Sequence, residues 1–276
     1  EFVMGYLEII RPLNCSITFI SVLVGAWVGR GMVLSLPLIL AGGAGFAACA
    51  FGNIVNDLLD VEIDRINDPR RPLPSGRARR EGAIAVAAFF GLAGILIALR
   101  LGRNPMLLVF CALVLLFLYA IYFKRTTAAN PVVALIASLS FLLGGWIAGN
   151  NFCLVPFGFA LLIHLPREIV KDVIDLEGDR PAGVRSLPIR FGARPALVLS
   201  AILLGLLAGL LPLPYLLKIL SFRYMVVVIL GALPLLVFII IKIIKVLGKP
   251  DRPALMRLSA LLKVVMGIGL IGFIVG

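Results

Sequence analysis

The sequence has 276 residues, of which 61% are hydrophobic and only 14% are charged, and its mean hydropathy is +1.10. Soluble globular domains carry about 25% charged residues, so this composition excludes a soluble domain and indicates a membrane protein. The formal net charge is +12. Basic residues that flank membrane helices account for such an excess. We therefore expect these residues to interact with a lipid bilayer rather than with nucleic acid.

Apolar runs of about 20 residues recur along the chain, and each is long enough to cross a hydrocarbon core of roughly 30 Å as a helix. Continuously apolar runs such as "FCALVLLFLYAIYF" favour helices over a membrane barrel, whose strands would alternate. We predict an all-α fold, a single domain over residues 1–276 built as a bundle of about nine transmembrane helices around a central cavity. The predicted spans are 13–33, 36–59, 82–100, 105–123, 131–149, 152–175, 193–212, 222–245 and 255–275.

Nine spans place the N-terminus and the connections after spans two, four, six and eight on one side of the membrane. Twenty of the 26 Lys and Arg residues lie on this side, five lie on the other side, and Lys263 lies within the last span. All 14 acidic residues also lie on the first side. The positive-inside rule predicts that this side is cytoplasmic, in a multi-pass protein of the cell membrane.

Small and sulfur-containing residues inside the spans predict packing rather than chemistry. The four cysteines fall in four different spans without metal-site spacing and are predicted to be buried apolar groups. His164 is the only histidine, which argues against a histidine-based metal site or a Ser-His-Asp triad. Glycine pairs four residues apart predict close helix contacts, namely Gly25 with Gly29, Gly145 with Gly149, and Gly205 with Gly209.

An acidic pattern occurs twice. The stretch "NDLLDVEIDRINDPRRPLP" and the stretch "KDVIDLEGDRPAGVRSLP" share six charged positions at a constant offset of 115 residues, and a Leu-Pro pair follows in both. Such agreement predicts an ancestral duplication, with two related halves whose acidic motifs, at 53–64 and 168–179, lie at corresponding helix ends and face each other.

The spacing of these residues places the acids in rows, because residues three or four apart share one face of a helix. Stacked carboxylates repel each other, and each one in hydrocarbon costs about 2.5–3.5 kcal/mol, so a cationic partner is required. One alternative is pairing with nearby arginines. The first predicted row is Asn53, Asn56 or Asp57, Asp60 and Asp64, and the second is Glu168, Asp172, Asp175 and Asp179.

Carboxylate and amide oxygens without His or Cys favour Mg²⁺, whose coordination is often completed by substrate phosphate. Two facing rows therefore predict metal ions that bridge the protein to a diphosphate. Lys124 and Lys171 lie closest to the predicted helix ends and are expected to hold phosphate oxygens. A diphosphate above apolar helices fits a prenyl diphosphate, whose C–O bond would break to an allylic cation as Mg²⁺ stabilises the leaving group.

The two acidic motifs closely resemble the two Asp-rich motifs of the UbiA superfamily of intramembrane prenyltransferases. The resemblance covers essentially the whole chain, including "RPLN" near the N-terminus and "YAIYFKR" after the fourth span. It implies a Mg²⁺-dependent enzyme that transfers a prenyl group from its diphosphate to an aromatic or alcohol acceptor. It further implies that metal and diphosphate are bound by Asn56, Asp60, Asp64, Asp175 and Asp179.

The resemblance also suggests residues that handle the substrates. Lys124 and Tyr119 are similar to a short Tyr and Lys motif of the family, and Lys171 and Asp172 extend the second acidic motif. Arg11 and Glu168 lie where acceptor-handling residues are found by similarity. Glu168 is thus a candidate base.

Within the family, the motifs are most similar to the branch that includes digeranylgeranylglyceryl phosphate synthases. This similarity implies transfer of a geranylgeranyl group to geranylgeranylglyceryl phosphate in archaeal ether-lipid synthesis. Aromatic acceptors of the quinone, chlorophyll or haem type are the alternative within the family. A divalent-cation transporter is an alternative of another class, although no acidic residue on the far side continues a path.

Overall fold

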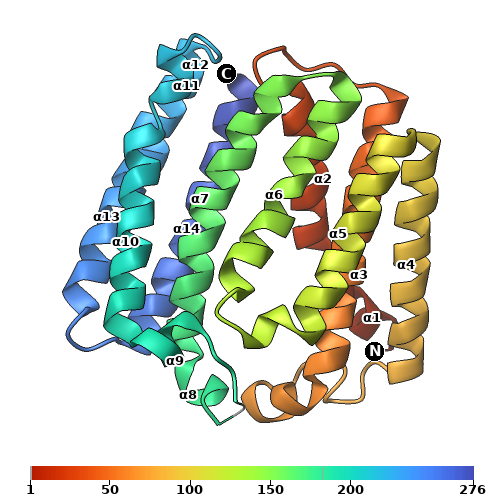
Figure 1. Ribbon diagram of the computed structural model, residues 1–276, viewed down its shortest axis with the longest axis vertical. Helices are drawn as coiled ribbons and strands as arrows, with labels where there is room; N and C mark the ends of the chain where they lie inside the picture. Colours follow the sequence, from red (N-terminus) through yellow and green to blue (C-terminus); the bar gives the residue numbers. More distant parts are fainter. Residues whose placement is uncertain (1, 182) are drawn as a thin grey trace.

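The computed structural model describes residues 2–181 and 183–276, and this part of the chain is helical without strands (Figure 1). Eight membrane-length apolar helices are present in this part of the chain, and α1 with α2 make a ninth span if the bent pair is counted as one. The all-α membrane fold is confirmed. The helices are α1 Phe2–Ile10, α2 Pro12–Trp27, α3 Leu36–Asn67, α4 Arg80–Arg100, α5 Arg103–Ile121, η1 Phe123–Arg125, α6 Ala129–Ala148, η2 Asn151–Cys153, α7 Leu154–Ile174, α8 Leu176–Asp179, α9 Leu187–Phe191, α10 Ala193–Leu210, α11 Leu213–Leu216, α12 Phe222–Val227, η3 Val228–Ala232, α13 Leu233–Val246 and α14 Arg252–Val275.

The helix that carries the first acidic motif is longer than predicted. α3 begins at residue 36 as expected but continues to Asn67 instead of ending at residue 59. Neither Gly nor Pro interrupts the chain between Asn53 and Pro69, so nothing in the backbone stops the helix before that proline. The acidic row therefore lies on one continuous, rigid helix.

Prolines shape two of the spans. Arg11 separates α1 from α2 in the left-handed conformation, with φ at 55°, and Pro12 begins α2. The two helices meet at 41°, because a residue before proline is disfavoured in the helical region. Pro234 lacks the N–H that would close a regular turn. A π-helical segment, Val228–Ala232, precedes it within the span formed by α12 and α13.

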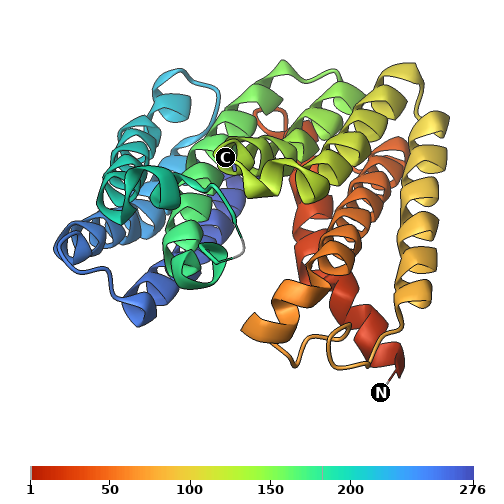
Figure 2. The same ribbon diagram turned by 60° about the horizontal axis from the view of Figure 1, so that its bottom comes forward.

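The helices form two packed groups that meet along α6, α7 and α2 (Figures 1 and 2). One apolar cluster joins α2 to α6 and includes Val22, Ala44 and Leu113. A larger cluster joins α7 to the C-terminal helices, α10 to α14, with Leu197 and Leu262 fully buried. Many large apolar side chains remain exposed on the outside of the bundle, which is the pattern of a surface that faces lipid.

Close packing at glycine holds for the first predicted pair and for Gly145 of the second. It fails for Gly149, where a Cβ would meet no other atom within 4 Å, and for both members of the third pair. A Cβ on Gly25 would overlap the carbonyl group of Phe141, and a Cβ on Gly144 would overlap that of Val22, so α2 and α6 touch through their backbones. By contrast, a Cβ on Gly205 or on Gly209 would meet no other atom within 4 Å. The prediction that this last pair marks a helix contact is therefore wrong, because these glycines lie on an unpartnered face of α10.

The four cysteines are all free. Cys15 and Cys153 are buried, as predicted, and Cys49 is half-buried. Cys111 is exposed on the outside of α5, so the prediction of burial is wrong for this residue. A small apolar thiol is tolerated on a lipid-facing surface as well as in a core.

The contact between α2 and α6 leads to a first prediction. Gly25→Val should lower the free energy of unfolding by about 1–3 kcal/mol, since the added methyl groups must push two backbones apart. Thermal unfolding in detergent measures the change. Gly205→Val is the matched control, because its side chain enters open space. Equal melting temperatures for the two variants would contradict this view of the helix interface.

Candidate active site

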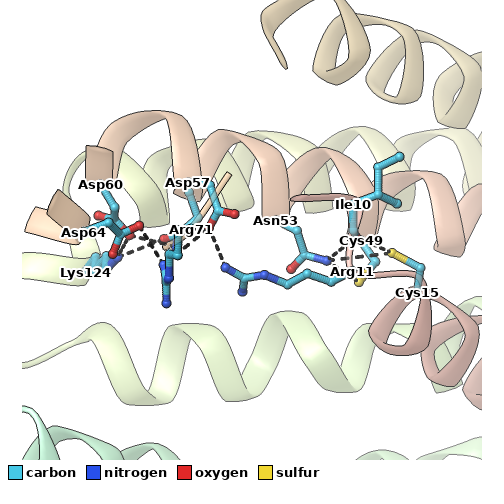
Figure 3. A network of polar contacts seen from close by, with 11 residues as sticks. Ile10, Arg11, Cys15, Cys49, Asn53, Asp57, Asp60, Asp64, Arg71 and Lys124 are labelled. Carbon is cyan, nitrogen blue, oxygen red and sulfur yellow. Dashed lines mark hydrogen bonds and ion pairs between the residues drawn. The ribbon is translucent and has the colours of Figure 1, made fainter. Parts of the chain in front are cut away.

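The first acidic motif forms a row of buried carboxylates on the last turns of α3. Asp57, Asp60 and Asp64 are only 5%, 7% and 6% exposed. Their spacing of three and four places them on one helix face, as predicted, and Figure 3 shows them pointing toward the same side. Ionised groups this deeply buried require partners.

Three cations from three different segments pair with this row (Figure 3). Arg11, at the bend between α1 and α2, donates to Asp57 at 2.5 Å. Arg71, in the loop after α3, lies 2.7 Å from Asp64 and 3.7 Å from Asp57. The third cation is Lys124, from the short helix η1, which pairs with Asp60. The row is thus electrically balanced by side chains alone.

The two asparagines of this motif have different roles. Asn56 donates to Asp60 at 2.9 Å and accepts from Lys124 at 3.1 Å, so it belongs to the charged network. Asn53 instead donates to the carbonyl oxygen of Ile10 at 3.0 Å and contacts the Cys15 sulfur at 3.8 Å. Asn53 therefore fastens the α1–α2 bend to α3.

The second acidic row is broken, which corrects the prediction of one continuous stripe. α7 ends at Ile174, and Asp175 separates it from the four-residue helix α8, at whose end Asp179 lies. Gly178 takes the place that Ile63 has in the first motif, and Pro181 follows. Both residue types disfavour a helix, and stacked carboxylates weaken it further.

The carboxylates of the second row differ in their partners. Glu168 is buried and accepts from Arg167 at 2.5 Å and from Lys171 at 2.7 Å. Asp172 lies one turn further along α7, and its carboxylate accepts a hydrogen bond of 2.9 Å from Asn130 of α6. Within the described chain, neither the Asp175 nor the Asp179 side chain has a hydrogen bond or an ion pair. The free acids of the site are therefore at the break.

The two rows lie at the same end of the bundle and act on each other. Figure 2 brings this end forward and shows α8 and the end of α3 there. Asp60 and Lys124 are close enough for their charges to influence Asp179, and Arg71 influences Asp175 in the same way. A backbone bond of 3.0 Å from Arg185 to the carbonyl oxygen of Arg125 also ties the loop after α8 to η1.

Tyr119 lies between the two rows. It is half-buried on α5, and the charges that act on its phenol come from both motifs, including Glu168, Asp172 and Asp60. It makes no hydrogen bond with any other described side chain. The structure thus brings together Arg11, Asn56, Asp57, Asp60, Asp64, Tyr119, Lys124, Glu168, Lys171, Asp172, Asp175 and Asp179.

Two residues of this network, Asn130 and Arg167, were not expected from the sequence. Arg167 is adjacent to Glu168 in the cytoplasmic half of α7 by the predicted topology, and in the sequence its basic side chain resembles ordinary membrane flank. Asn130 opens the apolar run of α6, and it is 3% exposed. A polar residue inside an otherwise apolar span is a usable signal for this position.

The electrostatics of the second row give a prediction for folding. Burial and the neighbouring carboxylate of Asp175 raise the pKa of Asp179 to about 6, compared with about 3.9 in an unfolded chain. The folded state therefore binds a proton on the Asp179 carboxyl more tightly than the unfolded state does. The stability that this proton contributes is present in full below pH about 4 and is lost as the pH rises through about 6.

In chelator-treated protein, Asp179→Asn should therefore raise the melting temperature at pH 7 by a few degrees and have little effect at pH 4, since the wild-type carboxyl is then already neutral. Thermal unfolding over this pH range measures the difference. Glu177→Gln, at an exposed position of the same helix, is the control. A melting-temperature difference that stays constant between pH 4 and pH 8 would contradict the raised pKa.

The chain matches known proteins over its full length. The model of the UbiA prenyltransferase family matches residues 18–261. Digeranylgeranylglyceryl phosphate synthase of Methanocaldococcus jannaschii is 35% identical, and the match covers 100% of this chain and 97% of that protein. The protein of the same name from Methanothermobacter thermautotrophicus is 36% identical, with 98% of this chain and 95% of that protein covered.

Solved structures give the same result. A structure of digeranylgeranylglyceryl phosphate synthase superimposes with a TM-score of 0.80 at 33% identity, covering 100% of this chain and 98% of the other. A UbiA homolog from Archaeoglobus fulgidus, solved with GPP and Mg²⁺, has a TM-score of 0.67 at 20% identity, covering 98% and 99%; this second likeness concerns the fold alone. Because the family model matches most of the chain, the chain belongs to the UbiA prenyltransferase family and is a membrane prenyltransferase.

Proposed function

We propose that the protein transfers a geranylgeranyl group from geranylgeranyl diphosphate to the free hydroxyl of geranylgeranylglyceryl phosphate, in the synthesis of archaeal ether lipids. The observation that carries this proposal is the match, over almost the whole of both chains, to relatives named digeranylgeranylglyceryl phosphate synthase. The geometry supports it, because an acidic site at the end of an apolar bundle fits an amphiphile with a diphosphate head and a hydrocarbon tail.

The donor set of the two rows fits Mg²⁺. Asn56, Asp60, Asp64, Asp175 and Asp179 offer carboxylate and amide oxygens, which hard divalent cations prefer. Among the described residues, no three His, Cys, Asp or Glu side chains converge into a ready-made metal cage. Diphosphate oxygens and water would therefore complete the coordination. When bound, Mg²⁺ supplies stabilisation of the negative charge on the leaving diphosphate.

The cations of the first row are placed to exchange partners. Lys124 and Arg71 are 33% and 37% exposed, whereas the carboxylates they hold are almost buried. A diphosphate offers oxygens with higher charge density, so these cations can turn to it through charge-assisted hydrogen bonds. Asp60 and Asp64 are then free to join the metal site. The Tyr119 phenol, which lacks a partner among the described side chains, is available to donate to the same diphosphate.

The acceptor side of the reaction involves Glu168 and Arg11. The acceptor oxygen forms a bond to the first carbon of the prenyl chain as the bond from that carbon to the diphosphate oxygen breaks. The hydroxyl proton must leave at the same time, and Glu168 is our candidate base for it. Arg11 fixes Asp57 beside the candidate site and is our candidate for a residue that contacts the acceptor.

The asymmetry of charge supports an orientation in the cell membrane. By the order of the spans along the sequence, the side with the acidic rows carries all 14 acidic residues and most of the Lys and Arg residues. We therefore place the active site at the cytoplasmic face. The connections on the opposite side contain no acidic residue, which disfavours a cation-transport function, since nothing there continues a polar path.

An assay of purified protein tests the proposed function. Geranylgeranyl diphosphate is offered with geranylgeranylglyceryl phosphate, a hydroxybenzoate or a naphthoate, and products are identified by mass. We expect the doubly prenylated glycerol phosphate and free diphosphate only from the first acceptor, with turnover lost in EDTA and restored by Mg²⁺. Turnover confined to an aromatic acceptor would overturn the acceptor assignment, and diphosphate-independent Mg²⁺ flux in vesicles would favour a transporter.

Substitutions in the two rows should separate catalysis from folding. Asp60→Ala and Asp175→Ala should each lower turnover by about 100-fold or more, because each removes a charged oxygen ligand from the site of charge development. Only Asp60→Ala should also lower the melting temperature, since it leaves Lys124 without its carboxylate.

Glu177→Ala, which removes an exposed acid from α8, is the control for both measurements. Near-normal turnover in the Asp175 variant would show that Asp175 is not part of the active site and would contradict the role proposed for the second row. A lowered melting temperature in that variant would show that Asp175 has a structural partner.

A further inference from the structure

Basic side chains gather around Glu168, the residue of α7 at which the second acidic row begins. Arg167 and Lys171 both donate to its carboxylate, at 2.5 and 2.7 Å. The Arg167 side chain is 15% exposed, and its Nε is buried without a hydrogen-bond partner among the described residues. A buried donor left unsatisfied in this way calls for a further acceptor.

A third cation lies near this cluster, on the last helix. Lys263 lies in the middle of α14, within a membrane-spanning segment. α14 packs against α7 (Figure 1), with Leu262 buried in their shared core. Lys263 lies within electrostatic range of Arg167, Lys171 and Glu168. Its side chain is exposed and has no ion pair with a described carboxylate. A lysine in the middle of a membrane-spanning helix is costly without an anion.

The charge balance of this cluster differs from that of the first acidic row. On α3, three carboxylates face three cations, so side chains alone neutralise the row. Glu168 is bonded to two cations, and Lys263 lies within electrostatic range of all three groups. Lys171 also acts electrostatically on Asp172 and Asp175 but makes no ion pair with either within the described chain. Arg167, Lys171 and Lys263 together carry more positive charge than Glu168 neutralises, and an anionic ligand would balance the excess.

We propose that Arg167, Lys171 and Lys263 form the binding site for the phosphate group of the acceptor lipid. This inference rests on the proposed function, whose acceptor is a phosphate monoester. Such a group carries roughly −1.5 to −2 charges at pH 7 and offers three strong acceptor oxygens. Guanidinium and ammonium groups are the side chains that bind phosphate without a metal. Because Asp175 and Asp179 are assigned to the metal-bound donor diphosphate, the metal-free acceptor phosphate is assigned to the basic residues.

The site also gives Glu168 a role that depends on the acceptor. Both its oxygens are occupied by Arg167 and Lys171, which makes the carboxylate a poor base. When the acceptor phosphate accepts hydrogen bonds from these cations, an oxygen of Glu168 becomes available. In a glycerol with an ether and a phosphate at its two ends, the remaining hydroxyl is adjacent to the phosphate-bearing carbon. Its proton passes to Glu168 as the new ether bond forms and the diphosphate leaves.

The substitution Lys263→Met tests the site, since methionine is apolar and suits a membrane helix. We expect the KM for geranylgeranylglyceryl phosphate to rise about tenfold or more, with the KM for geranylgeranyl diphosphate changed by less than about twofold. The preference for this acceptor over the same lipid without phosphate should shrink by a similar factor. Lys263→Arg should restore most of it. In EDTA and without the diphosphate donor, geranylgeranylglyceryl phosphate should raise the melting temperature of wild type and not of Lys263→Met.

Lys242→Met is the matched control, because Lys242 is an exposed lysine of the neighbouring helix α13 that lies over the Phe238 ring. It should leave both KM values unchanged. If wild type uses the phosphorylated acceptor but Lys263→Met keeps the same preference for phosphate, the inference is wrong and the proposed function stands. If wild type does not use the phosphorylated acceptor at all, both the proposed function and the inference are overturned.

Discussion

The structure depends on how carboxylates are kept at the ends of membrane helices. A buried acid in an apolar bundle is unfavourable unless cations or hydrogen bonds compensate it. The chain brings Arg11, Arg71 and Lys124 from three separate segments to one face of α3 for this purpose. This compensation holds the bent first span, the loop after α3 and η1 together, so the same ion pairs that allow the acids to be buried also define the shape of the candidate active site.

Much of the fold could be predicted from hydropathy alone, because a span of the membrane requires a continuous apolar run with its backbone bonds satisfied internally. The number of spans and their approximate bounds follow from this requirement. Their ends do not. α3 extends past residue 59 because charged residues can remain helical where the helix leaves the lipid, and α7 stops at Ile174 because Asp175 begins a separate turn. A difference of one Gly and one Pro between otherwise similar motifs is enough to change the geometry.

The residue types of the candidate site could be read from the sequence, but their pairings could not. Asp and Asn residues at spacings of three and four, twice in the chain, indicated oxygen ligands on two helix faces. Which cation pairs with which acid depends on tertiary contacts across long separations, such as Arg11 with Asp57 or Asn130 with Asp172. Nothing in a single sequence gives the rotational register of one helix against another. For the same reason, the sequence gives Lys263 only as an isolated charge within the last span, and its position near Glu168 depends on how α14 packs against α7.

The break at Asp175 has a consequence for the order of events during turnover. In the first motif every carboxylate of the row has a cationic partner, whereas in the second Asp175 and Asp179 have none among the described side chains. If the donor binds as we propose, Asp175 and Asp179 could hold Mg²⁺ without giving up a partner, whereas Asp60 and Asp64 would first have to release Lys124 and Arg71. Binding would then occur in two stages, with a loose encounter complex that tightens as these two cations turn to the diphosphate.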